Sequence, residues 1–212
     1  MNSGTTRNFI PRNLAVGCVF LLWLIYTVLQ TLSVLETIGE IPYAFLGFIP
    51  GLLGVGVLLL AGISSQDCFL TLKPISTKGF LVLVAIAIFA LSTMLPFGVW
   101  QGWSWMAALV FAPMSGISQE LFFRSALLPA MRSILKNKPF VALLLHSVLF
   151  GLWHIGPLFM GAPIGAVIAI MFVPFLSGLG WGWQVVRDKT VIWAMIQHSL
   201  IWVIGNQFAY TA

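Results

Sequence analysis

The sequence predicts an all-α protein: a polytopic transmembrane helix bundle with about seven spans. Of its 212 residues, 60% are hydrophobic and only 7% are charged, and the mean hydropathy is +1.04. A water-soluble globule of this size needs far more polar surface than such a composition supplies. The apolar residues also form long runs, and the basic residues stand between these runs. Together these observations indicate an integral membrane protein.

Seven apolar runs are each long enough to cross a hydrocarbon core of about 30 Å at about 1.5 Å per residue. They cover approximately residues 14–35, 44–63, 80–100, 103–131, 139–157, 162–186 and 190–210. The first run resembles a signal peptide because Arg7 and Arg12 precede it. At roughly 22 residues it is longer than a signal-peptide core of about 7 to 15, so we expect a retained span.

The basic residues predict the orientation of the bundle. If successive loops alternate between two sides, every loop Lys and Arg falls on one side: Arg7, Arg12, Lys73, Lys78, Arg132, Lys136, Lys138, Arg187 and Lys189. The positive-inside rule then predicts a cytoplasmic N-terminus. The net charge of +5 follows from this placement, so we expect contact with the lipid bilayer and no nucleic-acid partner.

All of the charged residues and histidines inside the predicted spans fall in three of the seven runs. With the amides beside them, the polar residues of these three runs include Gln119, Glu120, Arg124, His146, His154, Gln197, His198 and Asn206. An ionised side chain at mid-membrane costs about 3 kcal/mol on insertion scales, so such groups pair with one another or serve a function. Glu120 and Arg124 lie four residues apart and can neutralise each other along one helix face. This pairing does not explain the histidines.

Glu120, His154 and His198 fall at similar depths when about 1.5 Å is counted per residue, so one cavity could hold all three. A carboxylate beside a histidine can activate water, and a second histidine can donate a hydrogen bond to an oxyanion, which are the parts of a hydrolase. The same three side chains could instead hold a zinc ion, although no His-Glu-x-x-His spacing supports a metal. Taken singly, each histidine is more simply a packed core residue.

Three motifs, "QELFFR", "FGLWH" and "IQHSLIW", follow one another within residues 103–206. In order and spacing they resemble the CPBP family of CAAX prenyl proteases and bacteriocin-processing enzymes. The pattern of that family is Glu-Glu-x-x-x-Arg, then Phe-x-x-x-His, then His-x-x-x-Asn or Asp. The chain accordingly divides into residues 1–102, whose helices carry no motif match, and a CPBP-like protease core at residues 103–212.

The resemblance extends to individual residues. Glu120 and Arg124 match the second Glu and the Arg of the first motif. Phe150 and His154 match the second motif, and His198 opens the third. The resemblance implies that the first Glu and the Phe-x-x-x-His histidine activate water, and that the last motif binds the oxyanion. Arg124 and Phe150 would then support the site.

The implied activity is that of an intramembrane endopeptidase, which hydrolyses a peptide bond of a membrane-associated or lipid-modified substrate. We expect a multi-pass protein of a prokaryotic cytoplasmic membrane. The resemblance requires no cofactor, and zinc on Glu120, His154 and His198 stays an alternative.

The sequence departs from the family pattern at two positions. Gln119 stands where the family has its first Glu, and an amide can orient water but cannot deprotonate it near neutral pH. Glu120 could replace the missing base only if the helix were locally rotated, for example by a kink at Pro113. Trp202 stands where the family has Asn, and its indole N–H can still donate to an oxyanion.

Three functions remain in view. The first is an active endopeptidase that uses His154, His198, and either Glu120 or a water held by Gln119. The second is a catalytically weakened family member that acts in bacteriocin immunity or as a membrane-protein assembly or scaffold factor. The third is a small transporter or proton relay, which the absence of a convincing internal repeat disfavours.

Overall fold

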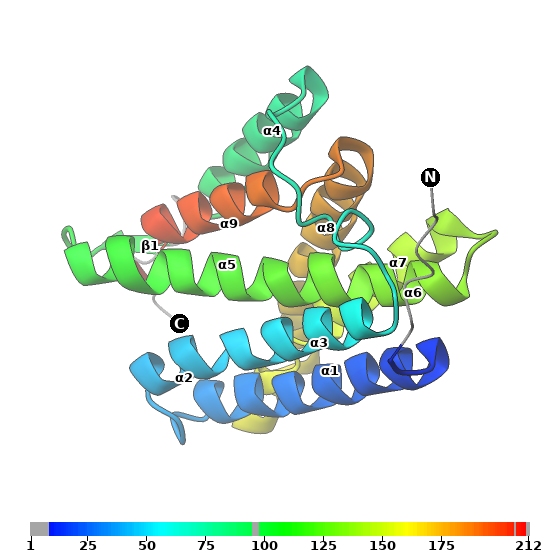
Figure 1. Ribbon diagram of the computed structural model, residues 1–212. Helices are drawn as coiled ribbons and strands as arrows, with labels where there is room; N and C mark the ends of the chain where they lie inside the picture. Colours follow the sequence, from blue (N-terminus) through cyan, green and yellow to red (C-terminus); the bar gives the residue numbers. More distant parts are fainter. Residues whose placement is uncertain (1–8, 95–97, 206, 211–212) are drawn as a thin grey trace.

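The computed structural model describes residues 9–94, 98–205 and 207–210. These residues are mostly helical, which confirms the predicted all-α class (Figure 1). The elements are α1 (Arg12–Val34), α2 (Glu40–Leu46), α3 (Phe48–Leu60), α4 (Thr77–Met94), β1 (Gly98–Trp100), the π-helical η1 (Ala107–Phe111), α5 (Ala112–Phe122), the π-helical η2 (Phe123–Leu127), α6 (Leu128–Ile134), α7 (Pro139–Leu152), the 3₁₀-helical η3 (Gly156–Met160), α8 (Ile164–Asp188), α9 (Ile192–Gly205) and β2 (Phe208–Tyr210).

Among the described residues, three helical segments are long and apolar enough to cross a membrane: α1, Pro139–Met160 and α8. The shorter apolar helices α3 and α9 lie beside them in the bundle (Figure 1). The predicted fourth span is one unbroken helical path from η1 to α6 that contains two π-helical stretches. A membrane helix bundle is thus the architecture, whereas the number of seven spans stays a prediction.

Two of the predicted runs do not remain helical to their ends. Residues 98–100 and 208–210 were expected to end helices, but they form the antiparallel pair β1–β2, with Gly98 opposite Tyr210 and Trp100 opposite Phe208. The backbone N–H of Gln101 also bonds to the carbonyl of Gln207. Aromatic and β-branched residues favour strands, and pairing satisfies backbone groups where the helices end. Asn206 lies outside the described residues.

Close helix contacts depend on glycine. A Cβ on Gly116 of α5 would lie 2.4 Å from Oγ of Ser199 and 2.6 Å from its backbone nitrogen in α9. A Cβ on Gly182 of α8 would lie 2.5 Å from Cδ1 of Leu143 in α7. Lipid does not drive helices together hydrophobically, so small residues that allow close backbone approach stabilise such contacts. The pairs α5–α9 and α7–α8 therefore form the rigid centre of the bundle.

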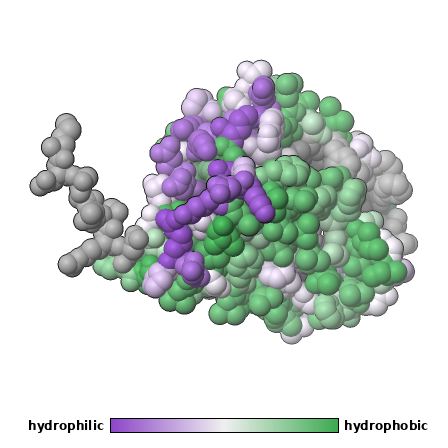
Figure 2. Space-filling view, turned by 90° about the vertical axis from the view of Figure 1, so that its right-hand side faces the viewer, coloured by the Kyte–Doolittle hydropathy of each residue, from purple (hydrophilic) through white to green (hydrophobic). Residues whose placement is uncertain are grey.

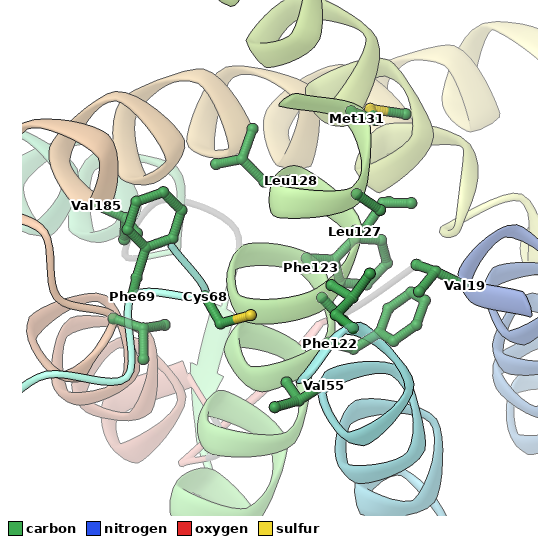
Figure 3. Close-up of a cluster of buried hydrophobic side chains, with 14 of the residues drawn as sticks. Val19, Val55, Cys68, Phe69, Phe122, Phe123, Leu127, Leu128, Met131 and Val185 are labelled. Atoms are coloured by element: carbon green, nitrogen blue, oxygen red, sulfur yellow. The ribbon is translucent and has the colours of Figure 1, made fainter. Parts of the chain in front are cut away.

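The buried core lies where α1, α3 and the α5–α6 path meet. Figure 3 shows Val19, Val55, Phe122, Phe123 and Leu127 in mutual contact there. On the outside, by contrast, large apolar side chains are exposed, as expected of a surface that faces lipid: Leu21, Leu52, Leu81, Ile168 and Phe172 are examples.

The basic residues gather at one end of the bundle. Arg12, Arg132, Lys136 and Lys189 line a single pocket, although they come from three separate parts of the chain. Figure 2 shows a band of hydrophilic residues, bordered by apolar surface, on the face of the molecule that is seen from this end.

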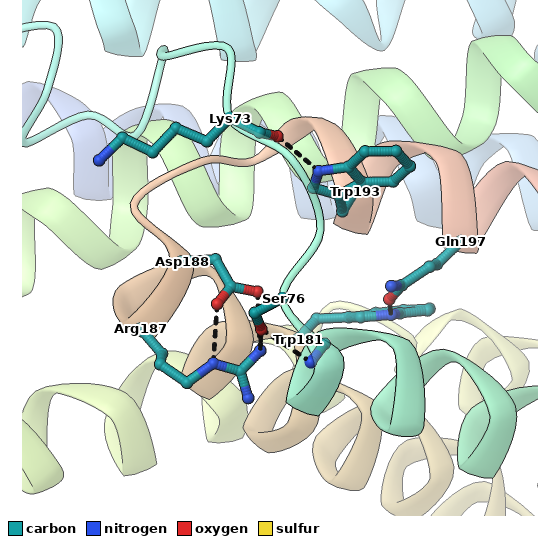
Figure 4. Close-up of polar contacts among 8 residues, drawn as sticks. Lys73, Ser76, Trp181, Arg187, Asp188, Trp193 and Gln197 are labelled. Atoms are coloured by element: carbon teal, nitrogen blue, oxygen red, sulfur yellow. Dashed lines mark hydrogen bonds and ion pairs between the residues drawn. The ribbon is translucent and has the colours of Figure 1, made fainter.

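The loop between α3 and α4 is fastened to the end of α8 and the start of α9. The Nε1–H of Trp193 donates to the carbonyl of Lys73 at 2.7 Å, and Nη2 of Arg187 donates to Oγ of Ser76 at 2.7 Å (Figure 4). Arg187 also pairs with Asp188. Residues of this loop also line a pocket together with four basic residues, Arg12, Arg132, Lys136 and Lys189, which the sequence predicted to lie on one side of the membrane.

Candidate active site

The centre of the candidate site is a buried ion pair on the α5–η2 path. Nε of Arg124 lies 3.0 Å from Oε2 of Glu120, and neither side chain has any exposed surface. This is the i, i+4 pairing that the sequence predicts. In a membrane interior the pairing offsets much of the cost of burying each charge.

The carboxylate of Glu120 has a second partner on a distant helix. Nδ1 of His198 in α9 lies 2.8 Å from Oε1 of Glu120. An ionised carboxylate can only accept hydrogen bonds, so Nδ1 of His198 carries the proton. Glu120 thus joins α5 to α9 at the level where Gly116 lets the two helices approach closely.

Aromatic rings enclose the guanidinium of Arg124. Its Cζ lies 4.2 Å from the ring centre of Phe150 and 5.5 Å from that of Trp181. Trp181 stacks on the imidazole of His198, with the ring centres 4.5 Å apart, and donates from Nε1 to Oε1 of Gln197 at 2.9 Å. These cation–π and stacking contacts hold Arg124 and His198 in fixed positions.

His154 lies just beyond the end of α7 and is half-buried. Its Nδ1 is 3.0 Å from the carbonyl of Phe150, one helical turn earlier. A carbonyl only accepts, so Nδ1 of His154 is the protonated nitrogen and Nε2 of the neutral ring keeps its lone pair. The ring of Phe150 contacts both histidines, with its centre 5.4 Å from that of His154 and 6.4 Å from that of His198.

Both histidines therefore have the same arrangement. In each ring Nδ1 is occupied by an acceptor, and no described residue forms a hydrogen bond with Nε2. A fixed tautomer with a free Nε2 is the arrangement a histidine needs to exchange a proton with a substrate or with water.

Gln119 and Trp202, the two departures from the family pattern, both belong to this region. Gln119 is buried on α5, and its Oε1 has no hydrogen-bond partner among the described residues. Trp202 lies roughly parallel to His198, with the ring centres 6.5 Å apart, and its buried Nε1 likewise has no partner in the described part of the chain. Gln119, next to Glu120 in the sequence, thus has an unpartnered acceptor, and Trp202, beside His198, has an unpartnered donor.

The three residues considered for zinc are not gathered into one ligand set. Within the described ranges, no group of three His, Cys, Asp or Glu side chains could hold a metal ion. Both carboxylate oxygens of Glu120 already face Arg124 and His198, and His154 bonds to a backbone carbonyl. These positions do not fit a metal, so no catalytic step is derived through one.

Two further residues, His146 and Trp181, lie near the candidate site. His146, the third histidine in the predicted spans, is fully buried in α7 with its ring 6.4 Å from that of Phe123, and no ring contact or hydrogen bond joins it to His154 or His198 in the described part of the chain. Trp181 belongs to the group, but sequence reasoning missed it because it carries no charge. The only signal was its position in the segment "GLGWGWQ" before the last motif.

The fold and the site define a class of helical membrane protein that keeps ionisable and hydrogen-bonding groups within its bundle. Residues 98–204, half of the chain, match the family described as Type II CAAX prenyl endopeptidase Rce1-like, and the chain belongs to this family. The resemblance read from the three motifs is therefore confirmed. Proteins of this family are intramembrane proteases that act on membrane-associated substrates. Comparison with curated proteins and with solved structures found no match for the chain.

Proposed function

We propose that this chain is an active intramembrane endopeptidase that hydrolyses a peptide bond of a membrane-associated or lipid-modified substrate. The observation that carries the proposal is the matched pair of histidines. Each has its Nδ1 fixed by an acceptor, each has an Nε2 without a hydrogen bond to any described residue, and both contact the ring of Phe150. Packing alone does not require two such rings beside a buried Glu–Arg pair.

In the proposed reaction His154 is the general base. Its Nε2 accepts a proton from a water molecule that Gln119 orients through Oε1, and the resulting hydroxide attacks the scissile carbonyl carbon. The proton then passes from His154 to the leaving nitrogen, so that the products are an amine and a carboxylic acid. Gln119 needs no basicity in this scheme, because an amide oxygen only has to accept a hydrogen bond from the water.

His198 and Trp202 would bind the oxyanion. In its imidazolium form His198 would keep Nδ1–H on the carboxylate of Glu120 and donate from Nε2–H to the negative oxygen. Trp202 would supply a second donor from Nε1. Arg124 holds the carboxylate of Glu120 in place and does not itself touch the substrate.

Cleavage of a fluorogenic prenylated Cys-a-a-X peptide by the purified protein in liposomes tests this assignment. We expect His154→Ala to lower the rate by at least about 10²-fold, the usual contribution of a general base. His146→Gln, in α7 and without a ring contact or hydrogen bond to His154 or His198 in the described part of the chain, is the control and should keep the activity. Equal rates for His154→Ala and the native chain would contradict the assignment.

Gln119 itself favours a second function, that of a catalytically weakened member in bacteriocin immunity or membrane-protein assembly. The variant Gln119→Glu separates the two. An active enzyme should cleave the peptide before the substitution, whereas a weakened member should gain cleavage only afterwards. In the second case the biological phenotype should survive combined substitution of His154 and His198.

We further propose about seven spans, a cytoplasmic N-terminus and a prokaryotic cytoplasmic membrane. The gathering of Arg12, Arg132, Lys136 and Lys189 around one pocket supports this orientation, because basic residues are retained on the cytoplasmic side. Cysteine accessibility tests it: a cysteine introduced at Lys136 should react with an impermeant maleimide in inverted vesicles but not in whole cells.

A further inference from the structure

A basic pocket of about 250 Å³ opens at the end of the bundle where α1 begins and α6 and α8 end. Four cationic side chains line it: Arg12, Arg132, Lys136 and Lys189. Its apolar wall includes Ile63, Phe69 and Pro129. Residues from four distant segments thus converge on one concave site, which the proposed peptidase chemistry does not use.

The protein compensates the positive charge of the pocket only in part. Asp67 is its one carboxylate, and that group accepts a hydrogen bond from Oγ of Ser64 at 2.7 Å. Among the residues that the structure describes, none of the four cations forms an ion pair. Four like charges around a small volume repel one another unless an anion enters. The pocket therefore selects for negative charge.

The pocket is rigidly built. Phe69 is buried, and the charged ends of Arg132 and Lys189 lie 5.9 Å and 6.0 Å from its ring centre. Phe69 and Lys189 both have φ of 58°, a left-handed conformation that is unfavourable for bulky side chains. Backbone strain of this kind persists only where surrounding contacts enforce it, and it is frequent at binding sites.

Hydrogen bonds enforce this conformation. The N–H of Val191 donates to the carbonyl of Phe69 at 3.0 Å, and the hydroxyl of Thr71 donates to the carbonyl of Lys189. The hydroxyl of Thr190 in turn donates a hydrogen bond to the carbonyl of Thr71 at 2.5 Å. The two strained residues are thus linked to each other, which fixes two sides of the pocket.

The position of the pocket identifies the source of the anion. Arg12 is the first residue of one candidate span, and Lys189 follows the last residue of another, so the pocket lies at the level of lipid headgroups. Apolar side chains adjoin it and are exposed, with Leu14 at 57% and Ile134 at 48%. A ligand with a phosphate in the pocket could therefore lay acyl chains along this surface.

We propose that the pocket binds the phosphate of an anionic phospholipid headgroup. Arg132 offers a planar fork of N–H donors that matches phosphate oxygens, and the two lysines add compact positive charge. Basic pockets between the ends of membrane helices bind anionic headgroups in this way. The proposal is independent of peptidase activity, because it concerns only binding of lipid at the end of the bundle.

Binding of defined lipids to the full, delipidated chain in detergent micelles tests the proposal. Phosphatidylglycerol and phosphatidylcholine with identical acyl chains are titrated in parallel, and native mass spectrometry counts the bound lipid. We expect phosphatidylglycerol to bind more tightly. Each removed cation should weaken it about fivefold, so Arg132→Gln with Lys189→Gln should weaken it about 25-fold. Arg132→Lys, which keeps the charge, should lose less than Arg132→Gln.

A control variant and two control ligands test whether the pocket binds an anionic phospholipid. Lys138→Gln removes a basic residue from the same end but outside the pocket, and it should leave the affinity unchanged. An equal loss in Lys138→Gln, or equal affinity for phosphatidylcholine, would overturn the proposal. Inorganic phosphate is titrated separately: if it binds as tightly as phosphatidylglycerol and displaces it, the ligand is free phosphate and the lipid assignment fails.

Discussion

Glu120→Gln removes the one buried carboxylate that contacts both Arg124 and His198. At an effective dielectric constant of about 20, unit charges 3.0 Å apart attract by about 5.5 kcal/mol. Removing one partner of a buried pair typically costs about 3 to 5 kcal/mol, because the other charge stays buried without compensation. We therefore expect the free energy of unfolding to fall by about that amount.

A second substitution isolates the charge effect. The amide oxygen of Gln at position 120 can still accept from Nδ1 of His198, and Arg124→Met removes the remaining charge while filling a similar volume. The double variant should therefore recover most of the lost stability. Unfolding in mixed micelles of dodecyl sulfate and dodecyl maltoside measures all four members of the cycle.

We expect peptide cleavage and the free energy of unfolding to respond differently in the double variant. The double variant lacks the carboxylate that lies on Nδ1 of His198, so we expect its peptide cleavage to stay low although its fold is restored. Losses of stability that simply add in the double variant would refute the reasoning, since the two charges would then not be coupled.

Three other predictions follow from single contacts. Gly116→Ala should cost about 1 to 3 kcal/mol of unfolding free energy and reduce cleavage, because its Cβ would collide with the backbone of Ser199, whereas Gly165→Ala, with nothing within 4 Å, should be neutral. Trp202→Phe removes an N–H donor but keeps the ring; kcat for peptide cleavage should fall by about 10²-fold with KM nearly unchanged, and an unchanged kcat would exclude an oxyanion role. Burial raises the pKa of the Cys68 thiol to about 12, so this thiol should resist maleimide at pH 8 and react after unfolding. Labelling of Cys68 in the folded chain would contradict its burial.

The sequence was sufficient to predict features that depend on local spacing. Hydropathy predicted the helices, and the i, i+4 spacing predicted the pair of Glu120 with Arg124, because both follow from helix geometry alone. The shared position of Arg12, Arg132 and Lys189 was also predictable, since the alternation of loops determines which helix ends lie together.

Features that depend on how helices pack could not be predicted in this way. The bond between Glu120 and His198 exists because Gly116 lets α9 approach α5, and hydropathy contains no information on which face of α9 turns inward. The β1–β2 pair was missed because short apolar strands at the ends of long apolar runs look like continuing helix. Trp181 was missed because its role depends on stacking against His198.

The structure changes the question that Gln119 raises. Sequence reasoning offered Glu120 as a substitute base if the helix were rotated, but both oxygens of that carboxylate already face Arg124 and His198. Neither oxygen of this carboxylate is therefore left without a partner to receive a water molecule. Among the described residues of the group, the remaining basic atoms are the Nε2 atoms of the two histidines. In the mechanism proposed above, the two histidines differ in their partners: Nδ1 of His198 lies on the carboxylate of Glu120, whereas Nδ1 of His154 lies on a neutral carbonyl. We propose on this ground that His198 acts as the donor and His154 as the acceptor, a mechanism that would need no carboxylate at position 119.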